Sequence, residues 1–290
     1  MSIRTLVVGV VILSAACGGR ERDDGFTYTP VKVIDTGTAD SAAQEDSGIQ
    51  GDAADDAWAP DAADGAGVDA PVEDGANPLD VGLDPGPVDP GPAQVCGLWN
   101  AVRGQASLGT WSGSVATCDA GELSADGRGT IVALVNLYRE MAGMPLIVEK
   151  PAYTAEAQAC SLMMHAAKDI DHEPGPDWPC YTPLGAEAAS GSNLSTTHGV
   201  EAVDGYMVDY GNPETIGHRR WILSNWLDGI GAGSTSEYSC MRVGSDASHG
   251  EPWIAWPSPG DVPIQAFFHS GWSSLDDEGW TVQSDTLAVD

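Results

Sequence analysis

Basic side chains are scarce in this 290-residue sequence. Only 12 residues are Lys or Arg, against 43 that are Asp or Glu, which gives a formal net charge of −31 at pH 7. A protein that binds nucleic acid presents a basic patch or stripe to the phosphates, and the sequence contains no such stretch. The composition therefore argues against nucleic acid as a partner.

The sequence also lacks the motifs of the common hydrolases. His172-Glu173 is followed by Pro174, which excludes the H-E-x-x-H helix of a zinc protease. There is no G-x-S-x-G elbow for a serine hydrolase, and no C-x-x-C pair for a thiolate zinc site. These absences favour a binding or structural protein over an enzyme.

The N-terminal apolar run is short. It extends from Leu6 to Leu13, too few residues to span a bilayer, and ends at the small residues 14–16. This pattern predicts a secretory signal peptide over residues 1–16. Cys17 follows directly and resembles the lipidated cysteine of a bacterial lipoprotein, although Ser14 replaces the usual leucine three places earlier. We expect an exported protein whose Cys17 carries a lipid in a membrane leaflet; an ordinary signal peptide with an incidental cysteine is the alternative.

Residues 17–95 are rich in Asp, Ala, Gly and Pro and poor in large apolar side chains. Lys32 is the only basic residue between Asp23 and Gln94. Such a segment buries too little apolar surface to offset its ordering entropy, and its like charges repel one another. We expect a long disordered acidic tether, with an extended lead-in over residues 96–125.

Five cysteines follow Cys17, and in an exported protein they predict disulfides. They are Cys96, Cys118, Cys160, Cys180 and Cys240. Cys160 and Cys180 are the expected pair, because one lies on a helix and the other on the loop that returns past it. Five is an odd number, so one thiol is expected to stay free or to pair between chains, and Cys96 is the candidate.

Helical periodicity dominates the middle of the chain. Apolar residues recur at helical spacing from Ile131 to Met141. Pro151 opens a second helix in the first-turn position that proline favours. Residues 200–210 and 215–223 predict a third helix and a short fourth one.

Two histidines lie within this helical region. His172 lies in a long loop that runs to about residue 200, and long loops in compact domains are often functional. His218 begins the short fourth helix, behind Gly217. Two histidines delivered by two separate segments predict a shallow metal or ligand cleft.

The pattern then changes to strands. Residues 229–233, 238–244 and 253–256 are typical of strands with glycine-rich turns. Helices followed by strands predict an α+β domain with helices packed on an antiparallel sheet. Residues 258–290 predict a β-rich tail, either incomplete or paired with the edge of the sheet. The tryptophans from Trp253 onward are expected to close the core.

Four blocks in this order resemble the CAP superfamily of cysteine-rich secretory proteins, antigen 5 and pathogenesis-related proteins, and its bacterial extracellular branch in particular. The blocks are 134–146, 157–159 with His172, 202–223, and 226–233. The resemblance implies a three-layer α-β-α sandwich over residues 126–257. It also implies that His172 and His218 are the two cleft histidines.

The loop after the first histidine departs from the family pattern. The family has Gly-Glu-Asn there, whereas this chain has Gly191, Ser192 and Asn193. A hydroxyl is a far poorer metal ligand than a carboxylate. The second family glutamate has no clear match either, since Val208 or Asp209 occupies that region. Nearby carboxylates remain candidates to substitute: Glu187, Asp209 and Glu214.

Two interpretations of the histidine pair stay open. The imidazoles of His172 and His218 hold Zn²⁺ or another divalent cation weakly, with water completing the coordination, or they only hydrogen-bond backbone and keep the shape of the cleft. The expected function is accordingly a surface-anchored CAP-type module at the bacterial cell envelope that binds a metal, a small apolar ligand or an envelope partner. The alternative is a metal-assisted hydrolase acting on cell-envelope material.

Overall fold

The computed structural model describes residues 11–14, 17, 91–209, 212, 215–244, 250–267 and 280–284. All of them belong to one compact unit, made of Met1–Gly19 and Pro85–Asp290. Of the expected tether, residues 18–90 lie outside the described residues, and residues 91–95 belong to a helix. No helix among the described residues is long and apolar enough to cross a membrane.

A four-stranded sheet is the centre of the fold, in the order β2-β4-β5-β3. The strands are β2 (Val148–Glu149), β3 (Ser192–Ser195), β4 (Gly229–Ser234) and β5 (Ser239–Arg242). β2 runs parallel to β4, and the β3–β5 and β4–β5 pairs are antiparallel.

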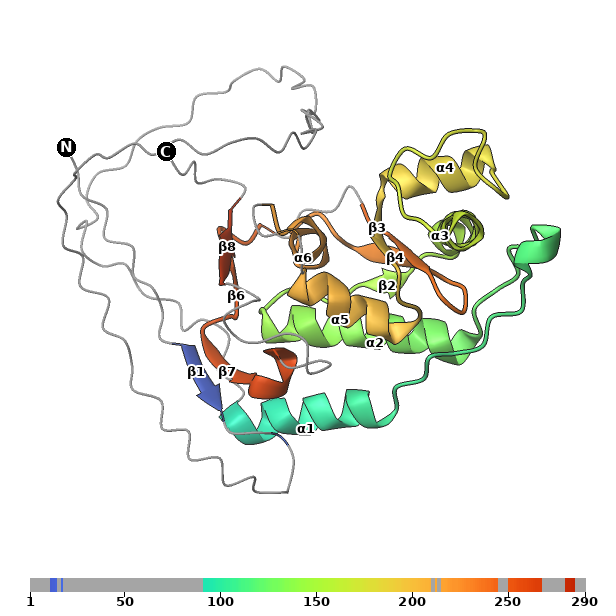
Figure 1. The fold of residues 1–290 in the computed structure, drawn as a ribbon. Helices are drawn as coiled ribbons and strands as arrows, with labels where there is room; N and C mark the ends of the chain where they lie inside the picture. The colour runs from blue at the N-terminus through green and yellow to red at the C-terminus, as the bar shows by residue number, and fades with distance from the viewer. Residues whose placement is uncertain are drawn as a thin grey trace, which may run out of the picture. The chain divides into compact units, whose positions relative to one another are not determined.

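Helices cover both faces of this sheet (Figure 1). On one side lie α3 (Pro151–Ala167) and α4 (Pro183–Ser190). On the other lie α2 (Ala125–Met141) and α5 (Val200–Val208), with the short α6 (Gly217–Ile222) next to α5. The three-layer α-β-α sandwich is therefore confirmed. The predicted helices at 131–141, 151–166, 200–210 and 215–223 correspond to α2, α3, α5 and α6.

α3 packs unusually close to β4 because β4 has glycines where the two meet. A Cβ built on Gly231 would lie 2.2 Å from the carbonyl carbon of Tyr153, and one on Gly233 would lie 2.2 Å from that of Ala157. Only a residue without a side chain allows this approach of backbone to backbone. The side chain of Gln158 completes the contact, since it donates to Ser234 O and accepts from Ser234 N–H.

The expected extended lead-in is wrong in its first part, because α1 spans Gly91–Gly104. Val95 and Trp99 are buried, and Arg103 makes a bidentate ion pair with Asp204 on α5 at 2.6 Å. Tertiary contacts stabilise this helix, and Pro92 lies in its first turn, a position that proline favours. Further along, η1 (Val115–Thr117) interrupts the loop before α2.

The tail adds two small sheets and a 3-10 helix. β6 (Ile254–Trp256) pairs antiparallel with β8 (Thr281–Gln283). β7 (Gly260–Pro263) pairs in parallel with β1 (Val11–Ser14), which lies within the expected signal peptide, and η2 (Ile264–Phe267) follows β7. Trp256 is buried against Tyr138 and Phe267, as expected of a core tryptophan, whereas Trp253 and Trp280 are exposed.

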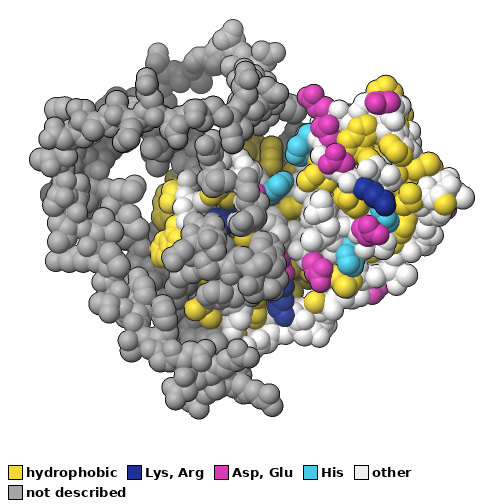
Figure 2. Space-filling view, in the orientation of Figure 1, with side chains coloured by type: hydrophobic (Ala, Val, Ile, Leu, Met, Phe, Trp, Pro, Cys, Tyr) yellow, Lys and Arg dark blue, Asp and Glu magenta, His cyan; other side chains and the backbone are white. Residues whose placement is uncertain are grey.

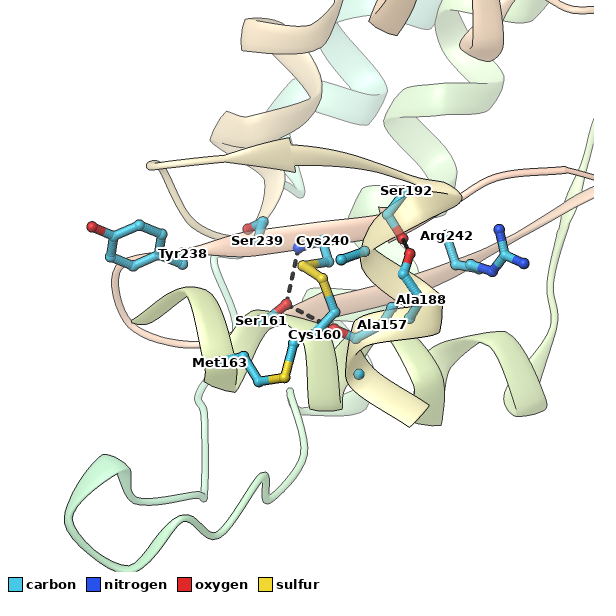
Figure 3. Close-up of a disulfide and its surroundings, with 12 residues drawn as sticks. Ala157, Cys160, Ser161, Met163, Ala188, Ser192, Tyr238, Ser239, Cys240 and Arg242 are labelled. Atoms are coloured by element: carbon cyan, nitrogen blue, oxygen red, sulfur yellow. Dashed lines mark hydrogen bonds between the residues drawn. A yellow bond between two sulfur atoms is a disulfide. The ribbon is translucent and has the colours of Figure 1, made fainter. Parts of the chain in front are cut away.

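All six cysteines are paired, so the expected pattern is wrong. The disulfides are Cys17–Cys96, Cys118–Cys180 and Cys160–Cys240, and none joins Cys160 to Cys180. The face of α3 that carries Cys160 lies on the sheet, where β5 presents Cys240 (Figure 3). Ser161 Oγ accepts the Cys240 N–H at 2.9 Å beside this bond. Cys180 lies at the end of the next loop, where it meets the loop around η1 and bonds Cys118 instead.

Candidate functional site at the α4–β3 corner

His172 lies in the loop between α3 and α4. α3 ends at Lys168, which adopts a left-handed conformation, and the Cys118–Cys180 bond closes the far end of the loop. The ring is exposed, and its Nδ1 lies 2.9 Å from Ala189 O on α4. A carbonyl oxygen only accepts hydrogen bonds, so Nδ1 carries the proton and Nε2 of the neutral ring keeps its lone pair.

His218 lies in the first turn of α6 and is held by a buried carboxylate. Asp209 Oδ1 accepts from His218 Nδ1 at 2.7 Å, and Oδ2 accepts from the backbone N–H of His218 at 3.0 Å. The Asp209 side chain is 1% exposed, whereas that of His218 is 30% exposed. In the neutral ring the Nδ1 proton is again directed to an acceptor, which leaves Nε2 of the accessible ring with its lone pair.

The turn between α5 and α6 positions this pair. Asp209 caps α5 in the left-handed region, with φ 55°, a conformation that Asp and Asn tolerate better than most residues. The buried guanidinium of Arg219 donates to the carbonyls of Met207 and Val208 at the end of α5. It thereby satisfies acceptors that the helix leaves unpaired and ties the two helices together.

A second buried arginine fixes the other end of α6. Arg139, on α2, is fully buried, and its guanidinium donates to Ile222 O at 2.7 Å and to Ser224 O at 3.1 Å. It also donates to Pro145 O and Leu227 O. Burial lowers the pKa of Arg139 to about 10, so the group remains charged at neutral pH.

Asn193 connects β3 to both helices of the site. Its Nδ2 donates to His218 O at 3.1 Å, and its own carbonyl accepts from the Tyr206 hydroxyl at 2.9 Å. The Tyr206 ring packs against the His218 ring with centroids 5.3 Å apart. Burial raises the pKa of the Tyr206 hydroxyl, so it stays a neutral donor. Asn193 therefore supports His218 through the backbone.

The remaining predicted auxiliary residues do not join the histidines. Ser192 is buried, and its Oγ donates to Ala188 O at 2.6 Å, in the interior of the α4–β3 corner. Glu187 is exposed on α4 and contacts neither histidine in the part of the chain that the structure describes. Glu214 lies outside the described residues.

The two histidines contact one short segment of chain. His172 bonds the carbonyl of Ala189, and the His218 carbonyl bonds the side chain of Asn193, four residues further along. Figure 2 shows histidine side chains at the surface of the domain, with acidic side chains close by. Among the described residues there is no cluster of three or more His, Cys, Asp or Glu side chains placed to hold a metal ion. Neutral imidazole is a ligand that Zn²⁺ accepts, and the described residues offer no carboxylate as a third ligand here.

The sequence did not indicate the role of Asp209 as the partner of His218. It is one of three carboxylates that could substitute for the missing glutamate, and nothing in the sequence separates it from Glu187 or Glu214. The available signal is its place directly after the apolar end of a predicted helix. A short polar residue there often takes the left-handed cap conformation that turns the chain.

The comparison with known protein families agrees with this architecture. The CAP family, described as the cysteine-rich secretory protein family, matches residues 132–242. These residues extend from α2 to the end of β5 and include both histidines. Residues 132–242 are therefore a CAP domain, as the sequence blocks predicted.

One solved structure is similar to the chain. It is a 1.5 Å crystal structure of an extracellular protein containing a SCP domain from Bacillus anthracis str. Ames, with 19% sequence identity and a TM-score of 0.33. The match covers 43% of this chain and 45% of that chain, which is less than half of the length of either protein. No curated protein matches the chain.

Proposed function

We propose that this protein is an exported CAP-type binding module of the bacterial cell envelope whose cleft holds a divalent cation between His172 and His218. One observation carries the proposal: in both rings Nδ1 points to an obligatory acceptor, Ala189 O in one and the Asp209 carboxylate in the other. Both Nε2 atoms therefore keep the lone pair that a metal requires. A carboxylate behind a histidine is also the usual support of a metal-binding imidazole.

The proposed affinity is modest. Two imidazoles supply only two of the four ligands that zinc prefers, so water must complete the coordination. Asp209 compensates part of the charge from behind His218, whereas Ser192 is occupied by its bond to Ala188 O. A bound cation would supply Lewis acidity and a fixed positive charge at the surface of a strongly acidic protein.

A small apolar ligand does not fit the cavity next to Tyr206, whose ring packs against His218. The cavity beneath α5, lined by Tyr206, Ala232 and Met241 among others, has a volume of about 10 Å³. This volume holds about one water molecule and leaves no room for an organic molecule. An apolar ligand would therefore have to bind elsewhere on the surface.

Calorimetric titration with Zn²⁺ tests the proposal. The intact chain should bind one ion weakly, and His172→Ala or His218→Ala should abolish binding, whereas His198→Ala, outside the corner, should not. Affinity should fall as the pH is lowered, because a protonated imidazole cannot coordinate. If the His172 and His218 variants bind as well as the intact chain does, the pair is structural and the proposal fails.

Ser192→Glu probes the missing carboxylate in the same titration. If the serine is the reason for weak binding, a glutamate there should tighten Zn²⁺ binding. Because Ser192 is buried, the thermal unfolding of the variant must be compared with that of the intact chain. A folded Ser192→Glu variant with unchanged affinity would show that Ser192 is not the cause of weak Zn²⁺ binding.

Anchoring through Cys17 is a separate part of the proposal. A sulfur that carries a thioether-linked lipid cannot also form the Cys17–Cys96 disulfide seen here. The two chemistries therefore predict different states of Cys96. In a lipoprotein, mass spectrometry should find a diacylglyceryl group on Cys17, and alkylation should find a free thiol at Cys96. Disulfide-linked peptides containing both cysteines would exclude the lipid anchor.

A metal-assisted hydrolase of cell-envelope material is the second candidate. The Asp209–His218 pair favours it, because a carboxylate-oriented imidazole is also the form of histidine that accepts a proton. Ser192 does not add a nucleophile, since its hydroxyl contacts neither histidine. Release of soluble fragments from purified envelope by the zinc-supplemented chain, lost in His218→Ala, would establish this activity. If no fragments are released, the binding module remains the proposed function.

A further inference from the structure

A second surface with the character of a binding site lies on the β6–β8 ribbon, after the residues that match the CAP family. The two strands pair in the register Ile254–Gln283, Ala255–Val282 and Trp256–Thr281. Figure 1 places this ribbon beside α6.

The ribbon has an inner and an outer face. Ile254 and Trp256 are buried on the inner face. Their neighbours there reach toward the domain: Gln283 Nε2 donates to Leu223 O at 2.9 Å, and Thr281 Oγ1 lies 3.5 Å from Arg219 NH1. Alternation along a strand therefore directs the other residues outward.

The outer face is aromatic and apolar. Trp253 is 43% exposed, Trp280 is 53% exposed and Val282 is 69% exposed, although indoles are among the side chains that proteins bury most. Ala255 lies between them, opposite Val282. In the register, Trp253 falls opposite residue 284 and Trp280 opposite residue 257. The two indoles are thus about four residues apart along the ribbon, or roughly 13 Å.

We propose that this outer face binds an uncharged polysaccharide, with Trp253 and Trp280 stacking on two sugar rings of one chain. The apolar C–H face of a sugar ring packs on an indole, and the short side chains of Ala255 and Val282 lie between the two tryptophans. The indole N–H groups of Trp253 and Trp280 make no hydrogen bond among the described residues, so they remain available to sugar hydroxyls.

Charge selects this ligand over the other occupants of an aromatic face. Within the described ranges 250–257 and 280–284 the only charged residue is Glu251. An anionic lipid surface or a second copy of this chain would bring negative charge to a protein whose net charge is −31. A neutral glycan brings none, and stacking needs no charged partner. The site is independent of the histidine cleft.

The test is co-sedimentation of the full chain with insoluble chitin and cellulose, followed by titration with their soluble oligosaccharides. Trp253→Ala and Trp280→Ala should each weaken binding about tenfold, as expected for the loss of one stacking contact. Trp221→Ala is the matched control, because Trp221 is equally exposed but lies on α6, and its affinity should stay within about twofold. Chains of two sugars should bind more weakly than longer ones, because both indoles must be reached.

Three outcomes would overturn the proposal. The first is no binding to any uncharged polysaccharide. The second is equal binding by the intact chain and a folded double variant of Trp253 and Trp280. The third is tryptophan-dependent binding to phosphatidylcholine vesicles but not to glycans, which would make the face a lipid contact. Zn²⁺ should not alter any of these results, so failure here is distinguishable from failure of the metal proposal.

Discussion

Replacing Asp209 by asparagine should invert the protonation of the His218 ring without unfolding the domain. Oδ2 of Asp209 accepts from two backbone groups, the N–H of His218 at 3.0 Å and that of Arg219 at 3.4 Å. The amide oxygen of the introduced asparagine must take this position, because the opposite orientation would leave buried N–H donors facing an NH₂ group. The NH₂ group then faces His218 Nδ1, which must accept, and the ring proton moves to Nε2.

The size of the effect follows from the same contacts. To bind a cation, the ring of the variant must return its proton to Nδ1, where it meets the NH₂ group and loses its hydrogen bond. One unmet buried hydrogen bond costs about 1–3 kcal/mol, so zinc affinity should fall about 10–100-fold. The variant should fold, because residue 209 has φ 55° and asparagine readily adopts this left-handed conformation.

Two measurements decide the matter. Long-range ¹H–¹⁵N correlation of the imidazoles should show His218 protonated at Nδ1 in the intact chain and at Nε2 in Asp209→Asn when no metal is present. Calorimetry should show the fall in zinc affinity, and the midpoint of thermal unfolding should change little. A variant that keeps the Nδ1 proton and the same affinity would refute the role assigned to Asp209.

Three further predictions concern stability. In urea unfolding, Gly233→Ala should destabilise the domain by about 3 kcal/mol, because its Cβ would lie 2.2 Å from the backbone of α3. Gly129→Ala is the control: a Cβ there has nothing within 4 Å and should stabilise α2 by about 0.5–1 kcal/mol. Equal and small effects of the two substitutions would contradict the close packing of α3 on β4. Removing the Cys160–Cys240 bond, with a sequence separation of 80, should cost about 4–5 kcal/mol in the chain-entropy model, and an unchanged melting temperature would argue against this pairing. Arg139→Met leaves four carbonyls without their donor and should cost about 3–5 kcal/mol, so a variant as stable as the intact chain would show that water replaces the guanidinium.

Periodicity predicted the elements whose packing is regular. Ile131 to Met141 and the face of α3 carry apolar residues at helical spacing, and both helices lie on the sheet as this spacing requires. α4 escaped prediction because its residues are mostly small, so no apolar stripe stands out against the loops on either side. Thr182 with Pro183 was the local signal, since the threonine hydroxyl caps the helix by accepting from Gly185 N–H.

The cysteine pairing could not be predicted from the sequence, because it depends on the order of the strands. Cys160 and Cys180 are neighbours along the chain, and this proximity was the basis of the wrong prediction. The partner of Cys160 is decided by which strand lies under α3, and that depends on the order β4-β5-β3, a property of the whole sheet. The same holds for Asp209, because its role depends on where the turn into α6 brings His218.

The Cys118–Cys180 disulfide sets the effective concentration of the His172 ring near an ion bound to His218. The loop bearing His172 is fixed at one end by α3 and at the other by this bond. Once a cation has bound His218, capture by His172 is an intramolecular step, and its strength depends on how small a volume the loop allows the second ring to explore. Reducing the disulfide removes no ligand, but it lowers the effective concentration of His172 around the ion. The proposed cation affinity of this corner should therefore depend on how oxidising its surroundings are.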